Sequence, residues 1–337
     1  MANKSFREMG PDFQYSAGGS TFIDIPRWGV LYEMMLRLSF RITTGGTLPA
    51  GAKFNTLARI IRGLSLKVNG KDTIVDLPGS SLCALAYNTY KRLPYGMSAA
   101  LPSATGTAYD YVIYLPVTLY LPHAVRPDDT GLNLGSPRIP GVPAQLKINW
   151  AAADCSDFYV TPNGAVLSNV TCEVSGLYES DPEPLFRDGP SAGKPRFWMT
   201  RVLDQRIVDV TQSNSAYPVI IDEKTGVFYR SLHIETLADD AGVDTVLANG
   251  KMELKVGSDV YGSLNAGHLK DYMARFLGVD PQVGVYWWNF DLFRSAITAI
   301  NTGGIPADLV LYMNVTKQGA NTCQIAVTRE GLRNLAV

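Results

Sequence analysis

Charged residues are scarce in this sequence. Asp, Glu, Lys and Arg make up 18% of its 337 residues, and the formal net charge is −1 at pH 7. Without a basic field the chain lacks the usual electrostatic signature of a nucleic-acid-binding protein, so we expect no sequence-specific nucleic-acid partner. The low charge also favours a surface that is largely covered by other protein subunits.

Residues that bind metals or act as nucleophiles are equally few. The sequence has four cysteines, Cys83, Cys155, Cys172 and Cys323, and three histidines, His123, His233 and His268. The cysteines form no CxxC pair and no metal-ligand spacing. Cys172 and Cys323 lie on the apolar face of predicted strands, where a free cysteine behaves as a small hydrophobic residue. We expect buried thiols, and histidines that serve neither a metal nor a reaction.

Known catalytic motifs are missing as well. The sequence has no GxSxG, no HExxH, no phosphate-binding loop and no dinucleotide-binding glycine pattern. Two carboxylate pairs, Asp128-Asp129 and Asp239-Asp240, fall in polar segments that we interpret as solvated loops. Glu33 and Glu173 lie on polar faces of predicted strands, where solvent or a cross-strand partner is expected. We therefore predict no catalytic, cofactor-binding or metal-binding residue, no cofactor and no enzyme activity.

The sequence also has no long hydrophobic run. The longest, residues 111–122, is too short to cross the roughly 30 Å core of a bilayer and contains Pro116. The opening residues Met-Ala-Asn-Lys-Ser-Phe-Arg-Glu lack the apolar core of a secretion signal. We expect a chain that is made in a reducing cytoplasm.

What the sequence does contain is an internal repeat. Residues 22–34 and 220–231 both read Ile-Asp, then a turn, then Gly-Val-apolar-Tyr. Residues 64–70 (Leu-Ser-Leu-Lys-Val-Asn-Gly) are matched by residues 252–258 (Met-Glu-Leu-Lys-Val-Gly-Ser). Three further pairs follow in the same order: helix-like stretches at 81–93 and 267–277, aromatic strands at 111–121 and 283–293, and Thr-Cys strands at 171–174 and 322–325. This shared order predicts two copies of one domain.

Apolar and polar residues alternate with a period of two within both halves. In residues 36–42 (Leu-Arg-Leu-Ser-Phe-Arg-Ile) every even position is apolar, which predicts a half-buried strand. Similar runs recur between Asn-Gly, Pro-Gly and Gly-Gly turns, a pattern typical of antiparallel sandwiches and barrels. We predict an all-β fold of two tandem eight-stranded jelly-roll barrels, each with a short inserted helix.

Proline and glycine divide the chain. Residues 122–143 are rich in both, which predicts a long surface loop within the first half. The proline-rich segment 181–197 is the best candidate for a semi-rigid linker. The predicted organisation is an N-terminal arm over residues 1–20, a first jelly roll over 21–180, the linker over 181–197, and a second jelly roll over 198–337.

The densest aromatic cluster is Val-Tyr-Trp-Trp-Asn-Phe at residues 285–290. A platform for stacking bases would need basic residues interleaved with the rings, and Arg294 is the only one close by. Alternation places Tyr286 and Trp288 on one face, which favours the barrel core or a subunit contact.

A duplicated jelly roll with a helix at the same place in each half (81–93 and 267–277), a large loop in one half and no reactive centre resembles the double-jelly-roll major capsid proteins. That family builds the shells of tailless bacteriophages with internal membranes and, in elaborated form, the adenovirus hexon. The resemblance covers residues 20–335 and rests on the order of elements.

The resemblance implies a structural protein of the virion capsid, made in the host cytoplasm. Its partners would be two further copies in a homotrimer, neighbouring capsomers, penton proteins and minor capsid proteins. Six barrels per trimer would form a pseudo-hexagonal block of an icosahedral shell. The family further implies upright barrels with long loops outward and the N-terminal arm near the base, where an internal membrane is a candidate neighbour.

Two alternatives remain open from the residues alone. A tandem β-sandwich that binds or cleaves carbohydrate would show an exposed aromatic platform or a cleft with two carboxylates, and would be a monomer. A phage spike component would form an elongated trimer without lattice contacts.

Overall fold

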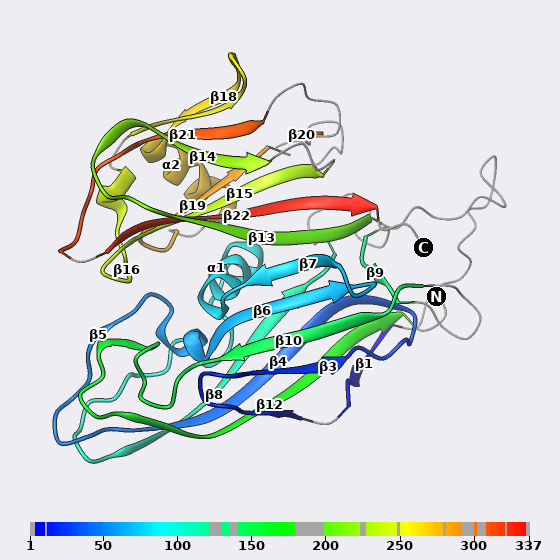
Figure 1. Cartoon of the computed structure of the whole chain (residues 1–337), viewed down its shortest axis with the longest axis vertical. Helices are drawn as coiled ribbons and strands as arrows, with labels where there is room; N and C mark the ends of the chain where they lie inside the picture. The colour runs from blue at the N-terminus through cyan, green and yellow to red at the C-terminus, as the bar shows by residue number, and fades with distance from the viewer. Residues whose placement is uncertain are drawn as a thin grey trace.

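Two β-barrels lie side by side in the computed structural model, with the first barrel below the second in Figure 1. The structure describes residues 4–10, 12–120, 130–134, 141–179, 199–222, 227–247, 250–278, 281–290, 300–301, 308–320 and 322–334. The predicted linker, residues 181–197, lies outside the described residues.

The first barrel consists of two facing sheets of four main strands. One has the order β1 (Lys4–Glu8), β12 (Val166–Glu179), β4 (Val30–Thr43) and β8 (Ala108–Thr118). The other has the order β3 (Ser20–Asp24), β10 (Ala144–Trp150), β6 (Ile61–Val68) and β7 (Asp72–Leu77). All of these pairs are antiparallel.

The second barrel repeats this pairing strand for strand. Its first sheet has the order β13 (Met199–Asp209), β22 (Cys323–Asn334), β15 (Phe228–Ala238) and β19 (Val285–Asn289). Its second has the order β14 (Asn214–Asp222), β21 (Leu309–Val315), β17 (Lys251–Val256) and β18 (Asp259–Asn265). The prediction of two tandem eight-stranded jelly rolls is confirmed.

Both barrels carry their helix between equivalent strands. Helix α1 (Gly79–Tyr90) joins β7 to β8, and helix α2 (Ala266–Leu277) joins β18 to β19. The remaining elements are short: β2 (Phe13–Gln14), β5 (Ala50–Ala52), η1 (Thr56–Ile60), β9 (Leu132–Asn133), β11 (Tyr159–Thr161), β16 (Ala241–Gly242), η3 (Asp244–Leu247) and β20 (Ile300–Asn301). The predicted inserted helices are therefore both present, at residues 79–90 and 266–277 rather than 81–93 and 267–277.

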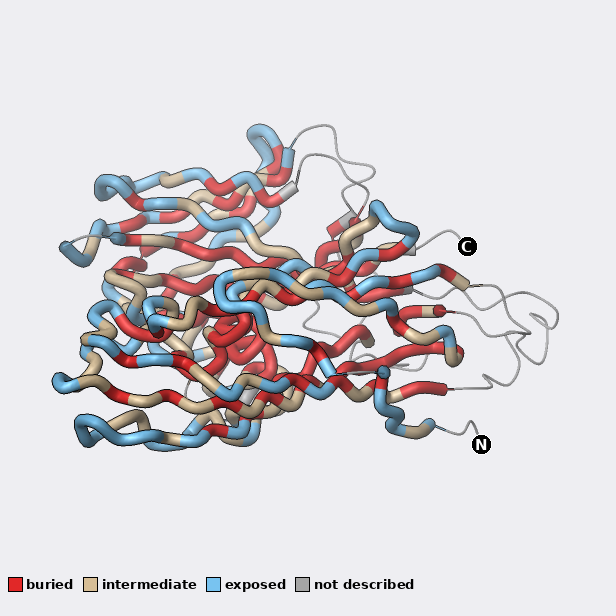
Figure 2. Tube along the Cα trace, turned by 60° about the horizontal axis from the view of Figure 1, so that its bottom comes forward, coloured by how far each residue is buried: buried red, intermediate tan, exposed pale blue. Residues whose placement is uncertain are grey.

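Each barrel has its own apolar core, built by the alternation seen in the sequence. Along β4, Leu36, Leu38, Phe40 and Ile42 are buried, and the intervening residues point outward. Buried residues alternate in this way with exposed or half-buried ones along many strands (Figure 2). Trp150 is fully buried in the first core, and Trp288 lies in the second.

The four cysteines are buried free thiols, as predicted. Burial raises the pKa of the Cys83 and Cys155 thiols to about 12. A thiol with so high a pKa is almost entirely protonated at neutral pH, and the thiolate is the reactive form. These side chains therefore act as small apolar residues.

Two segments differ from the sequence-based prediction. Residues 4–8, assigned to an arm outside the barrel, form β1 and pair with β12 along their whole length. Residues 132–133, assigned to a surface loop, form β9 and pair with Val30 and Leu31 of β4. Leu132, Leu134 and Val142 are buried in the first core. A high content of proline and glycine predicts turns, but it does not show that apolar residues between the turns, here Leu132, Leu134 and Val142, are buried.

Leu132→Ala should therefore destabilise the protein by about 2–5 kcal/mol, because it opens a cavity in a packed core. Val160→Ala, at a half-exposed position, is the matched control and should change stability by at most about 0.5 kcal/mol. Urea unfolding followed by tryptophan fluorescence measures both. Equal stabilities for the two variants would contradict the burial of Leu132 in the first core.

Candidate functional site at the junction of the two barrels

The two barrels meet through a pair of parallel strands. Strand β13 of the second barrel pairs with β7 of the first, with Leu203 opposite Val75 and Asp204 opposite Asp76. This contact joins a sheet of each barrel into one ten-stranded sheet. Burial raises the pKa of Asp76, and the neighbouring Asp204 adds to the effect. Asp204 also accepts a hydrogen bond from Arg329 Nε at 2.7 Å, so its charge is compensated within the second barrel.

Helix α1 fills the angle between the barrels. Residues 79–86 are all buried, although only part of them can face the first core. The far side of the helix contacts the outer face of the second barrel: Gln205 donates to Ser81 Oγ at 2.8 Å and to Thr328 Oγ1 at 3.1 Å. Asn88 Nδ2 lies 3.1 Å from His233 Nδ1. The two barrels therefore enclose α1 on opposite sides.

A buried ion pair lies beside this helix. Arg201 Nε donates to Glu330 Oε1 at 2.7 Å, and Arg201 Nη1 donates to the carbonyl oxygen of Thr118 in the first barrel at 3.0 Å. Arg201 is 4% and Glu330 is 7% exposed. Burial by itself would raise the pKa of Glu330, but Arg201, His233 and Ser231 outweigh it and hold that pKa well below its usual range. The pair stays charged at the boundary between the barrels.

Ser231, His233 and Glu330 form a cluster that superficially resembles a hydrolase triad. Ser231 Oγ donates to Glu330 Oε2, and His233 Nε2 lies 3.6 Å from the same oxygen. His233 also stacks on Trp287 with ring centroids 5.5 Å apart. Burial lowers the pKa of His233, which favours the neutral ring. In a triad the base accepts from the serine hydroxyl at the mouth of a pocket; here serine donates to the carboxylate, and all three side chains are buried. The cluster is suited to joining the barrels.

Glu235 on β15 is a second buried carboxyl group at this junction. Burial raises its pKa to about 7, and this shift is only partly opposed by the hydrogen bond from Ser81 and by the charge of Arg59. Ser81 lies on α1 and Arg59 on η1, so both groups that contact Glu235 belong to the first barrel. The protonation state of Glu235 is thus coupled to the fit between the barrels.

The rim of the junction contains a set of half-buried ion pairs. Asp240 accepts a hydrogen bond from the Phe54 backbone N–H at 2.8 Å through its carbonyl oxygen, and its carboxylate pairs with Lys53 at 2.9 Å and Arg59 at 3.8 Å. Asp239 accepts from the backbone N–H groups of Ala320 and Thr322. The prediction of a solvated loop for Asp239-Asp240 is wrong, because the two side chains hold loops in place.

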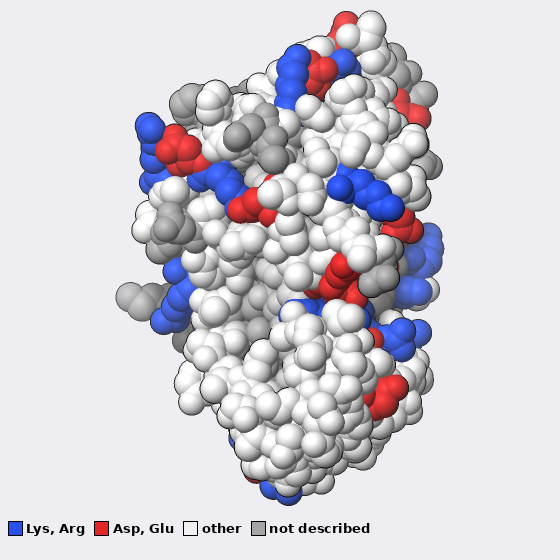
Figure 3. Space-filling view, turned by 90° about the vertical axis from the view of Figure 1, so that its left-hand side faces the viewer, with Lys and Arg blue, Asp and Glu red and all other residues white. Residues whose placement is uncertain are grey.

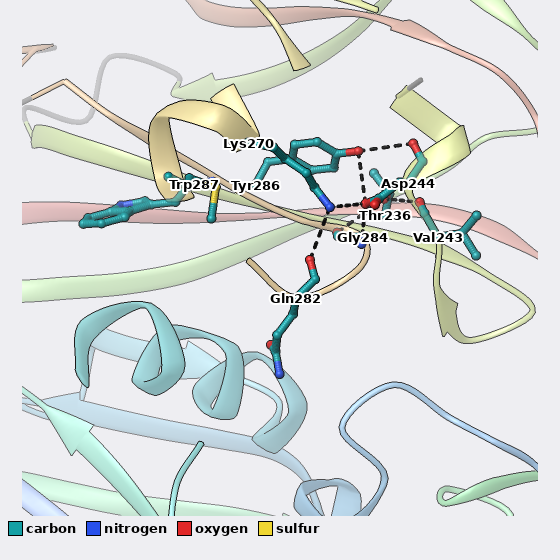
Figure 4. A network of polar contacts seen from close by, with 9 residues as sticks. Thr236, Val243, Asp244, Lys270, Gln282, Gly284, Tyr286 and Trp287 are labelled. Atoms are coloured by element: carbon teal, nitrogen blue, oxygen red, sulfur yellow. Dashed lines mark hydrogen bonds and ion pairs between the residues drawn. The ribbon is translucent and has the colours of Figure 1, made fainter. Parts of the chain in front are cut away.

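A polar network fixes α2 against the second barrel (Figure 4). Asp244 contacts Lys270 of α2 and accepts from the Gly284 backbone N–H at 2.7 Å. Lys270 also lies 4.9 Å from the Tyr286 ring centroid. Gln282 extends the network toward the first barrel, since its Nε2 lies 3.4 Å from Asn55 Oδ1.

The remaining residues considered from the sequence lie apart from one another. His268 is exposed on α2, and His123 and Asp128-Asp129 lie outside the described residues. Glu173 pairs with Arg37 across β12 and β4, as expected. Glu33 is buried rather than solvated: it accepts from Tyr90 at 2.8 Å, and burial raises its pKa despite Tyr90 and Arg201. Among the described residues, no group of three or more His, Cys, Asp and Glu side chains is arranged to hold a metal ion.

Two surface features of the first barrel stand out. A groove of about 800 Å³ runs over the outer face of β4 and β8, and it is lined by Glu33, Met35, Tyr90, Arg92, Leu93, Pro94, Tyr95, Val112, Tyr114 and Pro116. The loops at one end of the barrel, together with the strand ends that adjoin them (residues 43–52, 93–109 and 158–172, called here the charge-free loops), contain no Asp, Glu, Lys or Arg. Figure 3 shows the corresponding broad surface almost free of charge.

Within the described part of the chain, neither helix has the length and hydropathy of a membrane span. The amino-acid sequence matches no protein-family model and no curated protein sequence.

Solved structures do match, over nearly the whole chain. The STIV MCP superposes with a TM-score of 0.74 at 15% identity, covering 98% of this chain and 96% of that chain. A chain of Sulfolobus Turreted Icosahedral Virus gives 0.70 at 14% identity, covering 98% and 90%. The major capsid protein P2 from bacteriophage PM2 gives 0.62 at 12% identity, covering 99% and 98%. At such identities the likeness establishes the shared fold, the double jelly roll.

Removal of one partner of the buried ion pair should be costly. Glu330→Met leaves Arg201 buried without its carboxylate, and we expect a loss of about 3–5 kcal/mol in the free energy of unfolding. The double variant Arg201→Met/Glu330→Met removes both charges and should be more stable than the single variant. Chemical denaturation of the three proteins tests this, and a double variant that is less stable than the single one would contradict it.

Glu235 predicts a pH dependence of stability. Between pH 4.5 and about 7 the unfolded chain ionises this group while the folded protein keeps it protonated, so its contribution to stability is lost as the pH rises. Relative to Glu235→Gln, the wild-type protein should lose about 3 kcal/mol across this range. Urea unfolding of both proteins from pH 4.5 to 7.5 gives the difference directly. A difference that does not change with pH would show that Glu235 ionises normally in the folded protein.

Proposed function

We propose that this chain is a structural major capsid protein of an icosahedral virus, and that three copies form a pseudo-hexagonal capsomer. The observation that carries the proposal is the duplication itself: two barrels with the same strand order lie side by side and are joined by a rigid junction. Three such chains around an axis present six similar blocks, which tile a near-hexagonal lattice.

The structural neighbours support this role. The neighbour from bacteriophage PM2 is a major capsid protein, and another neighbour comes from an icosahedral virus. They share the fold over the full length of this chain and not over one barrel alone. The barrels also suit lateral packing, since β7 and β13, two of their edge strands, are already paired with each other within the chain and cannot recruit other strands.

The aromatic cluster at residues 285–290 does not support the alternative of a carbohydrate-binding or carbohydrate-cleaving protein. Tyr286, Trp287 and Trp288 are all buried, with Tyr286 and Trp288 in the second core and Trp287 against the junction. A sugar-binding platform requires aromatic faces open to solvent. We accordingly infer a structural role without catalysis.

We base the proposed orientation of the barrels in the shell on the positions of the chain ends. Strand β1 begins, β12 ends, β13 begins and β22 ends at the same end of the molecule (Figure 1). We infer that this end faces the interior of the shell, where minor capsid proteins and an internal membrane are candidate partners. The charge-free loops then face outward, and the sides of the barrels meet neighbouring capsomers and pentons.

The purified protein should be a trimer. Multi-angle light scattering at micromolar concentration should give about three times the 36.7 kDa mass of the chain. Electron micrographs of concentrated protein or of infected cells should show near-hexagonal blocks of this size. A chain that remains a monomer at these concentrations contradicts the proposal and favours an isolated β-sandwich protein.

A further inference from the structure

The two strands that form the junction inside the chain each have an equivalent strand at a far side of the molecule, and these two equivalents do not pair with each other. At the junction, β7 of the first barrel pairs with β13 of the second. The strand equivalent to β7 is β18, which pairs with β17 alone among the described strands. The strand equivalent to β13 is β1, which pairs with β12 alone among the described strands. The same two edges that meet inside the chain are thus also present at its two far sides.

Both of these edges expose apolar side chains. On β18, Val260 is 52% and Tyr261 is 55% exposed, and on β1 Phe6 is 60% exposed. An exposed strand edge with apolar side chains is a site for adding another strand.

The two helices show the same asymmetry. Helix α1 is buried on both sides because the outer face of the β13–β22–β15 sheet covers it. Helix α2 has the equivalent position in the second barrel, yet His268, Asp271 and Arg275 on its outer side are exposed. Among the described residues, no barrel covers the outer side of α2 as the second barrel covers α1.

The outer sheet faces are also covered in one barrel and open in the other. In the second barrel, His233 and Trp287 on the outer face are buried beside α1. In the first barrel, the equivalent strands β4 and β8 carry the open groove, where Tyr95 and Val112 are exposed. The groove on β4 and β8 therefore occupies the position that is equivalent to the contact of β15 and β19 with α1.

We propose that β18 and α2 of one copy dock on β1 and on the β4–β8 groove of a second copy, repeating the β7–β13 junction between subunits. The contact is heterologous, since each copy offers β18 at one side and β1 at the other. Such head-to-tail contacts form a closed ring when the rotation per copy closes, and three copies complete the six-barrel block. This inference rests on the proposed trimer and specifies the surfaces that form it.

The test uses two variants that block one edge each. Val260→Asp places a charge on the β18 edge, and Phe6→Asp places one on the β1 edge. Val160→Asp is the matched control, because Val160 is 49% exposed but lies on β11 in the charge-free loops. Circular dichroism and thermal melting of all three verify that they fold.

We expect Val260→Asp and Phe6→Asp each to be monomeric by light scattering, and Val160→Asp to remain trimeric. An equimolar mixture of the first two should contain a species of two chains, because the intact β18 of one variant meets the intact β1 of the other. That complementation distinguishes a head-to-tail contact from any self-pairing of one edge.

Three results would overturn the inference. The first is that either blocked variant still forms trimers. The second is that the mixture contains only monomers at concentrations where the wild-type chain is fully trimeric. Both results would reject these surfaces and leave the proposed capsomer intact. A wild-type chain that is itself monomeric would overturn the proposed function together with this inference.

Discussion

Unpaired strand edges are the constraint on which this molecule depends. A jelly roll built from two four-stranded sheets ends in strands whose outward N–H and C=O groups lack partners, and these groups cost free energy when they are buried unpaired. The chain satisfies one such edge internally by placing β13 along β7. Once these strands are paired, α1 is enclosed and the side chains of Arg201 and Glu330 lose contact with water. The desolvated charges at the junction are therefore a consequence of the strand pairing.

The polar character of the junction explains its fixed geometry. Apolar surfaces slide past one another at little cost, whereas a buried carboxylate tolerates few arrangements of its donors. Glu330 accepts from two side chains of its own barrel, and Arg201 reaches across to a backbone oxygen of the first barrel. A rotation of one barrel against the other would break these contacts within the low-dielectric interior. Apolar packing thus provides the stability of each barrel, while the polar contacts define how the two are placed.

The repeat and the period-two alternation in the sequence were sufficient to predict both barrels and the position of both helices. These features depend on local pattern, which sequence displays directly. The junction could not be predicted in this way. Glu330, His233 and Asp240 look like ordinary polar residues until long-range strand pairing brings Glu330 to His233 and Asp240 to Lys53. Residues 130–134 were misread for a related reason, because two buried leucines among prolines and glycines leave no periodic signal. The sequence of α1 holds one signal: the helix contains no charged residue, whereas a helix on a protein surface usually carries charged residues on its outer face.

The continuous ten-stranded sheet has a mechanical consequence. Bending one barrel against the other would break the two residue pairs that join β7 to β13 and the contact of Arg201 with the Thr118 carbonyl oxygen, so the pair behaves as a stiff plate. A container assembled from stiff plates obtains its curvature at the seams between them and not within them. Flat facets that meet at sharp creases are the shape that such plates favour, and the angle of each crease is decided by whatever fills the seam.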